Sequence, residues 1–309
     1  MPTEDLNHIF ISPFTDYGFY HLFGKEGKSR QNLIFLLNAI LHDYLGFEKI
    51  VDLSFGQTEN KGTSSVHKST RYDIHCTTDQ GHHIIVEMQN RWEPNFDNRL
   101  LYYVIETIAK QGVHKFMKQT WNYEIVPVVG IALCNFTREK FKKRPLTYYN
   151  LREIETNEPY GEQINLVYVN IKEFTEDEDK CKTELEKIIY SLNNMETLQK
   201  QQHNPFSTAP GDFYDNLLTM SQYSSLTPDE QMEYTRARMY ANDEMLRIQR
   251  SRAEGRAEGR AEGREEGRAE GENQQAWRSA EKMFAKNLDL ETISEFSGLP
   301  LDELKKHFS

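Results

Sequence analysis

Cysteine is scarce in this chain, and its three cysteines stand far apart. Cys76, Cys134 and Cys181 form no Cys-x-x-Cys pair, which argues against both a zinc site and a disulfide framework. The chain also lacks an apolar run of membrane-spanning length, because the longest such run is "IVPVVGIALCNF". Its first ten residues lack the basic and then apolar order of a signal peptide. We therefore expect a cytoplasmic protein with no membrane partner.

Net positive charge is missing as well. The formal net charge is −11, which by itself argues against a nucleic-acid partner. The charge is unevenly distributed, however, because residues 61–150 hold 13 Lys or Arg against 8 Asp or Glu, a net +5 that leaves −16 for the rest. A basic run of this kind can follow a phosphate backbone, so DNA is a candidate partner, and a solvated surface loop is the alternative. The candidate DNA contacts lie in "REKFKKR" (138–144) and are Lys140, Lys142, Lys143 and Arg144.

Helical and strand patterns alternate through the first 175 residues. Apolar residues recur at helical spacing near the start, and a β-rich block, a long helix and two further strands follow. This order predicts an α/β domain with a mixed sheet flanked by helices, and a polar helical region beyond it. The expected helices cover 12–47 and 97–117, and the expected strands cover 49–55, 71–77, 83–89, 124–136 and 162–171.

Two acids share one face of a predicted hairpin over residues 71–90. The turn-forming cluster "TDQG" separates two arms that alternate between apolar and polar residues. If the turn is centred near Gln80, residues whose numbers add to 160 lie opposite each other, which pairs Asp73 with Glu87. Like charges directly opposed across two strands are destabilising, so a hard divalent cation is expected to offset them. A slip of one residue in the register would separate the two acids.

Several segments resemble a known family. The Asp73 strand, "IIVEMQN" and the helix "RLLYYVIETIAKQ" are similar to the core of the PD-(D/E)XK nuclease fold, with Gln89 where a lysine usually stands. More closely, "FTDYGFYHLFG", "IVEMQNRWEPNFDNRLLYYVIETIAKQ" and "VPVVGIALCNF" resemble the PD-(D/E)XK nuclease family transposases, the recombination-promoting nucleases of the Rpn type in bacteria. The resemblance covers most of the chain. It implies a restriction-endonuclease-like sheet and a metal-dependent DNA endonuclease.

The resemblance also implies roles for particular residues. Asp73 and Glu87 would hold Mg²⁺, for which Mn²⁺ can substitute, and the backbone carbonyl of Met88 would add an oxygen ligand. Gln89 would orient the attacking water without supplying the positive charge of a lysine. The charge would then come from Lys110, Arg99 or Arg91, and Arg99 together with Gln111 on one helix is favoured by resemblance. Asp16 matches the acid of the family's first helix, and its alternative role is that of an ordinary acid at a helix N-terminus.

The C-terminal third is dominated by a four-residue repeat, "RAEGRAEGRAEGREEGRAEG" (252–271). On a helix, like residues would stack in columns that drift by about 40° per unit. Each Arg or Glu would then face its own kind four residues away, and the glycines would weaken the helix further, so an isolated helix is unfavourable. Two alternatives remain, a flexible linker or a segment that pairs with a second chain and makes a homo-oligomer.

The tail "LDLETISEFSGLPLDELKK" resembles two helices of a helix-turn-helix, although a small dimerisation cap fits it equally well. We thus predict four parts, namely a nuclease-like domain over 1–200, a helical connector over 201–251, the repeat over 252–272 and the helical tail over 273–309. The alternative to an active endonuclease is a catalytically silent DNA-binding or oligomeric scaffold, because the lysine is absent.

Overall fold

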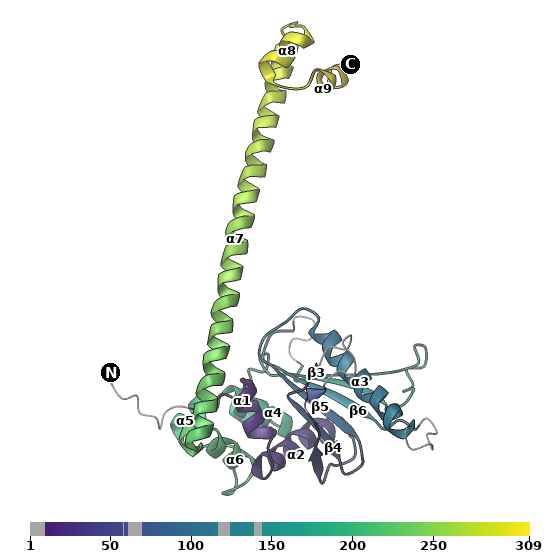
Figure 1. Cartoon of the computed structure of the whole chain (residues 1–309), viewed down its shortest axis with the longest axis vertical. Coiled ribbons are helices and arrows are strands. Elements are labelled where there is room, and N and C mark those ends of the chain that lie inside the picture. Colours follow the sequence, from purple (N-terminus) through teal and green to yellow (C-terminus); the bar gives the residue numbers. More distant parts are fainter. Residues whose placement is uncertain (1–9, 58, 61–69, 117–123, 139–143) are drawn as a thin grey trace, which may run out of the picture. The chain divides into compact units, whose positions relative to one another are not determined.

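The computed structural model of the chain describes residues 10–57, 59–60, 70–116, 124–138 and 144–309. Contacts divide the chain into two units, Met1–Met239 and Tyr240–Ser309, coloured purple to green and green to yellow in Figure 1. The expected connector is therefore split between the units, and its residues up to Met239 fold with the nuclease-like part.

A six-stranded mixed sheet forms the centre of the first unit, with the strand order β1-β4-β5-β6-β8-β7. Strands β5, β6 and β8 run parallel to one another, whereas β1, β4 and β7 pair antiparallel with their neighbours. The bounds are β1 (Leu53–Phe55), β4 (Ile74–Thr78), β5 (His83–Gln89), β6 (Val128–Cys134), β7 (Leu146–Asn150) and β8 (Ile164–Asn170), with β2 (Glu59–Asn60) and β3 (Thr70–Arg71) in a separate ladder. This arrangement confirms the predicted fold class, although β7 and β2 were not predicted, and Arg71, expected in the same strand as β4, belongs to β3.

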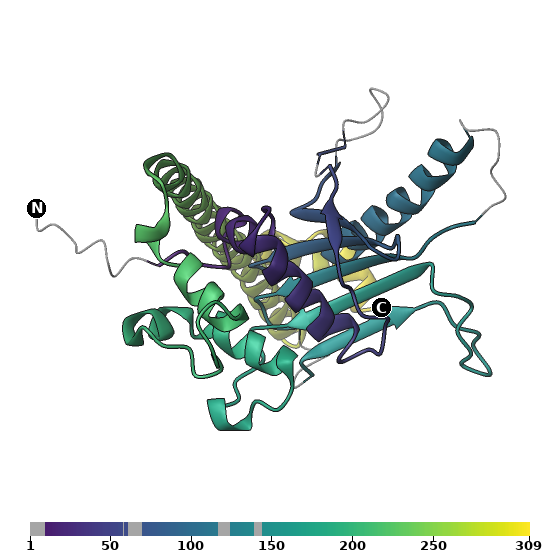
Figure 2. The ribbon, with the colours of Figure 1, turned by 90° about the horizontal axis from the view of Figure 1, so that it is seen from below.

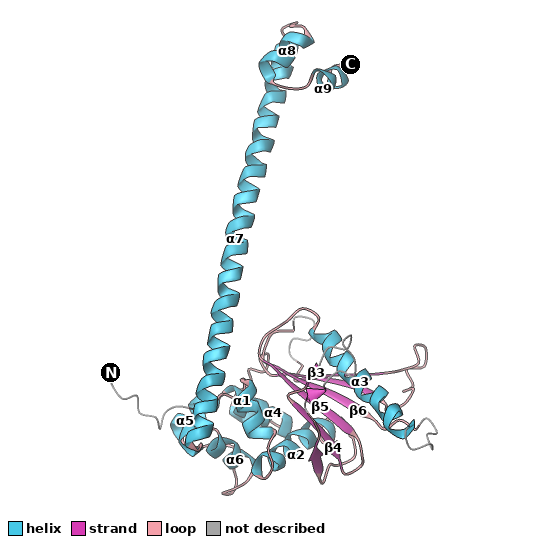
Figure 3. Ribbon diagram, in the orientation of Figure 1, coloured by secondary structure: helices cyan, strands magenta, loops and turns pink. Residues whose placement is uncertain are grey.

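Helices cover both faces of the sheet, as Figures 2 and 3 show. On one face, the apolar residues Ile84, Val86 and Met88 of β5 join a large core with residues of the helices before β1 and after β8. On the other face, Ile85 packs with residues of one long helix. The first group consists of α1 (Asp16–Phe23), α2 (Lys28–Leu41), α4 (Glu184–Asn193), α5 (Met195–Gln201) and α6 (Phe213–Met220). The 3-10 turn η3 (Glu178–Lys180) precedes α4, and η4 (Tyr223–Ser225) follows α6. The long helix is α3 (Phe96–Phe116).

A glycine sets how closely α3 approaches the sheet. Gly130 lies in β6, where every residue is buried. A Cβ atom built at Gly130 would come within 2.8 Å of Cγ2 of Val104 and within 3.2 Å of Cδ1 of Leu100, both on α3. Because such a distance is shorter than van der Waals contact, any side chain here would push the helix outward. The missing side chain thus holds α3 against the sheet.

The start of α1 is fixed by two neighbouring residues. Thr15 caps the helix, because its hydroxyl accepts a hydrogen bond from the backbone N–H of Gly18. A Cβ atom at Gly18 would overlap the carbonyl oxygen of Ser12, so only glycine fits this turn. Together these residues position Asp16, which is the first residue of the helix.

The repeat lies within a 57-residue helix, α7 (Pro228–Phe284). The structure therefore shows a helix where a flexible linker was one of the two alternatives. Within the second unit, α8 (Leu290–Ser297) and α9 (Leu301–His307) are joined through Gly298, which has a φ of 74°. Ala280, Ile293 and Leu304 form a small core between these two helices and the end of α7, which stabilises the tail as a compact helical cap.

Candidate active site

The two acids of the hairpin lie opposite each other at its open end. Strands β4 and β5 pair Ile74 with Val86 and His75 with Ile85, which confirms the register assumed from the sequence. Continued by one step, this register places Asp73 opposite Glu87. Since Glu87 follows Ile85 by two residues, it shares the sheet face that α3 covers.

Hydrogen bonds connect the two acids directly. The backbone N–H of Asp73 donates to Oε1 of Glu87 at 3.3 Å, and the backbone N–H of Met88 donates to Oδ2 of Asp73 at 2.8 Å. The ladder between β4 and β5 ends with the pair of Ile74 and Val86, so these side chains continue the pairing beyond the backbone ladder. The Asp73 carboxylate therefore helps to hold the strand end together as well as carrying charge.

Burial makes the ionised form of Glu87 unfavourable. Only 6% of this residue is exposed, and desolvation by burial, followed by the negative charge of Asp73, raises the pKa of Glu87 to about 8. The hydrogen bond from Asp73 and the positive charge of Arg99 act in the opposite direction, and the charge of Asp16 adds a smaller upward contribution. Without a cation, Glu87 is thus largely protonated at neutral pH.

Gln89 contacts a cation from the neighbouring helix. Nη2 of Arg99 donates to Oε1 of Gln89 at 2.9 Å, and Nη1 forms an ion pair with Glu93 at 2.7 Å. Gln89 is buried, whereas the Arg99 side chain is about one-third exposed (36%). The structure therefore brings a guanidinium from α3 to the strand position at which the wider fold carries a lysine.

Asp16 reaches the site from α1. It is exposed at the N-terminus of that helix, and its charge acts on Glu87 across the edge of the sheet. Asp16 belongs to the electrostatic surroundings of the pair. Its position at a helix N-terminus also agrees with the alternative role, that of an ordinary acid favoured by the helix dipole.

Gln111 and Lys110 lie elsewhere. The Gln111 amide donates to the carbonyl oxygen of Val126 at 3.1 Å and accepts from the N–H of Val126 at 2.9 Å. Val126 precedes β6 at the end where His83 begins β5, whereas Glu87 and Gln89 lie toward the other end of β5. Gln111 thus fixes the entry to β6, and Lys110 pairs with Glu106 at 2.8 Å.

Tyr103 is a neighbour that the sequence did not identify. It lies one turn after Arg99 on α3, is 8% exposed, and packs edge-on against Tyr72 with 4.9 Å between ring centroids. Burial and then the charge of Glu87 raise the pKa of Tyr103 to about 12. Tyr103 also belongs to the core cluster between α3 and the sheet. Helical spacing from Arg99 was the one signal that placed it beside the acids.

The basic run is only partly visible. Lys140, Lys142 and Lys143 lie outside the described residues, whereas Arg144 is exposed just before β7. Its carbonyl oxygen accepts a hydrogen bond from the side chain of Asn170 at 2.8 Å. Asn170 ends β8 in register with Cys134 of β6 and, through it, with Gln89 of β5. Arg144 therefore lies at the same end of the strands as the acid pair.

The acid pair fits a hard cation better than it fits no cation. Two adjacent carboxylates, one of them buried with a raised pKa, are destabilised as a doubly charged pair unless positive charge is near. The N–H of Met88 faces Asp73, and the carbonyl of a strand residue points to the same side as its N–H, so this carbonyl also faces the pair. Among the described residues no group of three or more Asp, Glu, His or Cys side chains gathers for a metal. Backbone oxygen and water would complete any coordination shell.

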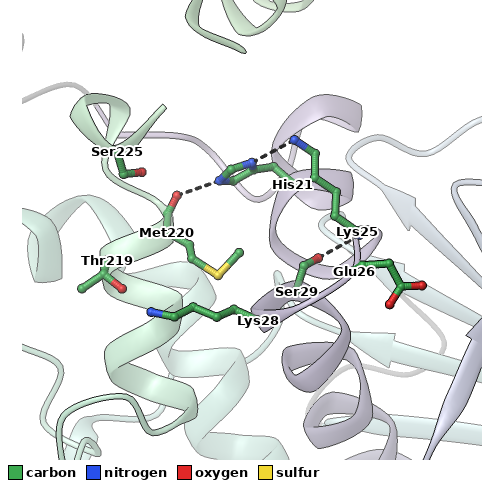
Figure 4. Close-up of a pocket in the computed structure, with 8 residues that line it drawn as sticks. All are labelled: His21, Lys25, Glu26, Lys28, Ser29, Thr219, Met220 and Ser225. Atoms are coloured by element: carbon green, nitrogen blue, oxygen red, sulfur yellow. Dashed lines mark hydrogen bonds between the residues drawn. The ribbon is translucent and has the colours of Figure 1, made fainter. Parts of the chain in front are cut away.

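A separate pocket of about 300 Å³ lies between α1, α2 and the end of α6 (Figure 4). Nε2 of His21 donates to the carbonyl of Met220 at 3.1 Å, and Nζ of Lys25 is 2.8 Å from the carboxylate of Glu230. Burial, followed by the charge of Lys25, lowers the pKa of His21. The charge of Lys25 is thus already compensated. The lining residues are His21, Lys25, Glu26, Lys28, Ser29, Thr219, Met220 and Ser225, so the pocket is distinct from the acid pair.

A mixed sheet with paired acids at a strand end, covered by helices on both faces, is consistent with the PD-(D/E)XK nuclease fold. The family model of the PD-(D/E)XK nuclease family transposases matches residues 13–251, and the chain belongs to this family. No curated protein and no solved structure matches the chain. In the ranges that the structure describes, no helix is both long and apolar enough to cross a membrane.

Proposed function

We propose that the protein is a metal-dependent DNA endonuclease that hydrolyses phosphodiester bonds. The observation that carries this proposal is the buried Glu87 carboxyl hydrogen-bonded to the backbone of the opposing Asp73. A buried carboxyl beside a second acid destabilises a fold, so the presence of Glu87 opposite Asp73 is best accounted for by a role in chemistry. Membership of the transposase family supports a DNA substrate and a role in recombination or mobile-element activity. The recombination-promoting Rpn type is the subgroup that we propose.

Asp73, Glu87 and the backbone carbonyl of Met88 are the proposed ligands of Mg²⁺, with Mn²⁺ as a substitute. Carboxylate and carbonyl oxygens are the ligands that these ions prefer. When bound, the ion lowers the pKa of a coordinated water and neutralises charge on the scissile phosphate. The protein's own contribution begins with Glu87, which must lose its proton to become a ligand, so ion binding is expected to release a proton near neutral pH.

Gln89 and Arg99 together are proposed to replace the lysine of the wider fold, Gln89 by orienting a water and Arg99 by supplying positive charge. The Gln89 amide lies two residues beyond Glu87 on the same strand face and can orient a water by hydrogen bonding. It carries no charge, and the guanidinium of Arg99 bonded to it supplies that charge. Asp16 is the proposed supporting acid, acting through the field that it exerts on Glu87.

The proposed DNA contact is the basic run. Arg144 lies at the end of the strands that also holds the acid pair, and Lys140, Lys142 and Lys143 precede it in the sequence. A positively charged surface beside a metal site would attract the DNA phosphate backbone and would not distinguish one DNA sequence from another.

The missing lysine favours one alternative, in which the same fold binds DNA without cutting it. Cleavage of supercoiled plasmid separates the two functions. Wild-type protein, Glu87→Gln and the surface control Glu162→Gln are incubated with Mg²⁺, Mn²⁺ or EDTA. We expect ion-dependent nicking by wild type and the control, and its loss in Glu87→Gln. Ion-independent cleavage, or equal cleavage by all three proteins, contradicts the metal-nuclease proposal. DNA binding without cleavage supports the alternative.

A further inference from the structure

The repeat helix is exposed on every side. Residues 251–275 of α7 are all exposed, and a Cβ atom added at any glycine from Gly255 to Gly271 would meet nothing within 4 Å. In the described second unit the one ion pair within the repeat joins Arg268 and Glu272 at 3.7 Å. Five glycines and the like charges at i, i+4 make this helix unfavourable alone. Within the unit, only the end of α7 packs against other helices, so the repeat offers its whole surface to a partner.

The repeat places four kinds of residue on four sides of the helix. Successive residues are about 100° apart, so within one unit Ala and Gly lie on nearly opposite sides, with Arg on one flank and Glu on the other. The apolar side carries Leu246, which is 50% exposed and precedes the first repeat alanine by seven residues. We name this side the alanine face. Its residues are Leu246, Ala253, Ala257 and Ala261, and Glu265 interrupts the alanine column before Ala269.

We propose that the alanine face binds the alanine face of a second copy of this chain, with the two helices parallel. The charge pattern selects this orientation. When two identical helices are related by a two-fold axis parallel to them, the Arg flank of one meets the Glu flank of the other on both sides of the contact. When they run antiparallel, Arg meets Arg and Glu meets Glu. Only the parallel pair converts the repulsion within each chain into attraction between chains.

The small alanine side chains allow the two backbones to approach closely, and the flanking charges remain at the rim. The glycine side would also bring opposite charges together, but it offers no side chain to bury. This proposal is independent of DNA cleavage, because no residue of the acid pair takes part in it.

Disulfide trapping in the full-length protein tests the face and the orientation together. The native Cys76, Cys134 and Cys181 are buried and do not compete. A disulfide needs Cα atoms roughly 4.4–6.8 Å apart. In a parallel pair the two copies of residue 253 lie side by side, so the Ala253→Cys variant is expected to form a disulfide between two chains under mild oxidation. Gly259→Cys lies about 120° around the helix from Ala253 and about 160° from Ala257, so it is the matched control and is expected to remain uncross-linked.

Each alternative result overturns the proposal. Cross-linking only between Ala253→Cys and Ala261→Cys in a mixture would establish an antiparallel pair, and cross-linking only of Gly259→Cys would establish the glycine side. A mass of one 36.3 kDa chain in sedimentation of the wild type at about 50 μM would exclude self-association at affinities tighter than that concentration.

Charge reversal tests the electrostatic reasoning separately. Arg256→Glu with Arg260→Glu gives one acidic variant, and Glu258→Arg with Glu262→Arg gives its basic counterpart. Each alone is expected to dimerise at least about tenfold more weakly than wild type, because like charges then meet on both flanks. An equimolar mixture is expected to recover a dimer. A dimer that is indifferent to all four substitutions would show that another surface holds it.

Discussion

Replacing Glu87 by glutamine should stabilise the metal-free protein, and the gain should grow with pH. Glutamine has the shape of a protonated glutamate, and its oxygen can still accept the hydrogen bond from the N–H of Asp73. In the wild type the pKa of Glu87 rises from 4.5 in the unfolded chain to about 8 in the folded one. The folded state therefore holds a proton that the unfolded state has lost between these values. Wild-type stability falls as pH rises through this window.

The magnitude follows from the width of the window. Each pH unit within it removes about 1.4 kcal/mol of unfolding free energy through this one group. Between pH 5.5 and 7.5 the advantage of Glu87→Gln over wild type should thus increase by about 3 kcal/mol at most.

Urea unfolding in EDTA at the two pH values, followed by near-ultraviolet circular dichroism, measures this difference. The exposed Glu162→Gln is the control and should show no such change between the two pH values. Adding Mg²⁺ at pH 7.5 should stabilise wild type and leave Glu87→Gln unchanged, because only the carboxylate is a ligand. If the advantage of Glu87→Gln is the same at pH 5.5 and 7.5, Glu87 is not protonated in the folded protein, and the reasoning from burial is refuted.

Three further predictions concern the surroundings of the pair. Gln89→Lys should retain or increase cleavage and should rescue Arg99→Gln, whereas Gln89→Ala should lose activity; a harmful lysine and a harmless alanine in the plasmid assay would refute the shared role of Gln89 and Arg99. Gly130→Ala should lose about 1–3 kcal/mol of unfolding free energy and slow cleavage, because α3 carries Arg99; unchanged urea midpoints would show that α3 adjusts freely. DNA affinity should fall steeply with salt, and Arg144→Gln should reduce the slope of log K against log salt by about one; an unchanged slope removes Arg144 from the interface.

The acid pair was predictable because period-two alternation and one turn fix a hairpin register. The numbers 73 and 87 followed from the turn near Gln80, and the structure has that register. The position of Gln111 was not predictable in this way. It is twelve residues from Arg99 on α3, or about 18 Å along a helix axis, and the sequence does not tell which end of β5 each helical residue approaches.

Two other features were hidden for different reasons. Strand β7 is only five residues long and follows Pro145 directly, so its pattern is too short to separate from a loop. The sequence prediction for the repeat considered only interactions within one chain, and these like-charge contacts and glycines disfavour a helix. Its helical state in the structure depends on terms that a single-chain argument omits, and pairing with a second copy is the one that we propose.

The hydrogen bonds of Asp73 bear on which of the two acids a relative would keep after losing its nuclease activity. The Asp73 carboxylate fastens the end of β5 through the N–H of Met88, so a lineage that stops cutting DNA still has a reason to keep it. Glu87 is different, because burial of its ionisable carboxyl weakens the fold at neutral pH and only a role in chemistry compensates for that. Among relatives with this architecture, an aspartate at the first position would therefore say little about activity. An apolar or amide residue in place of the glutamate would identify a relative without nuclease activity.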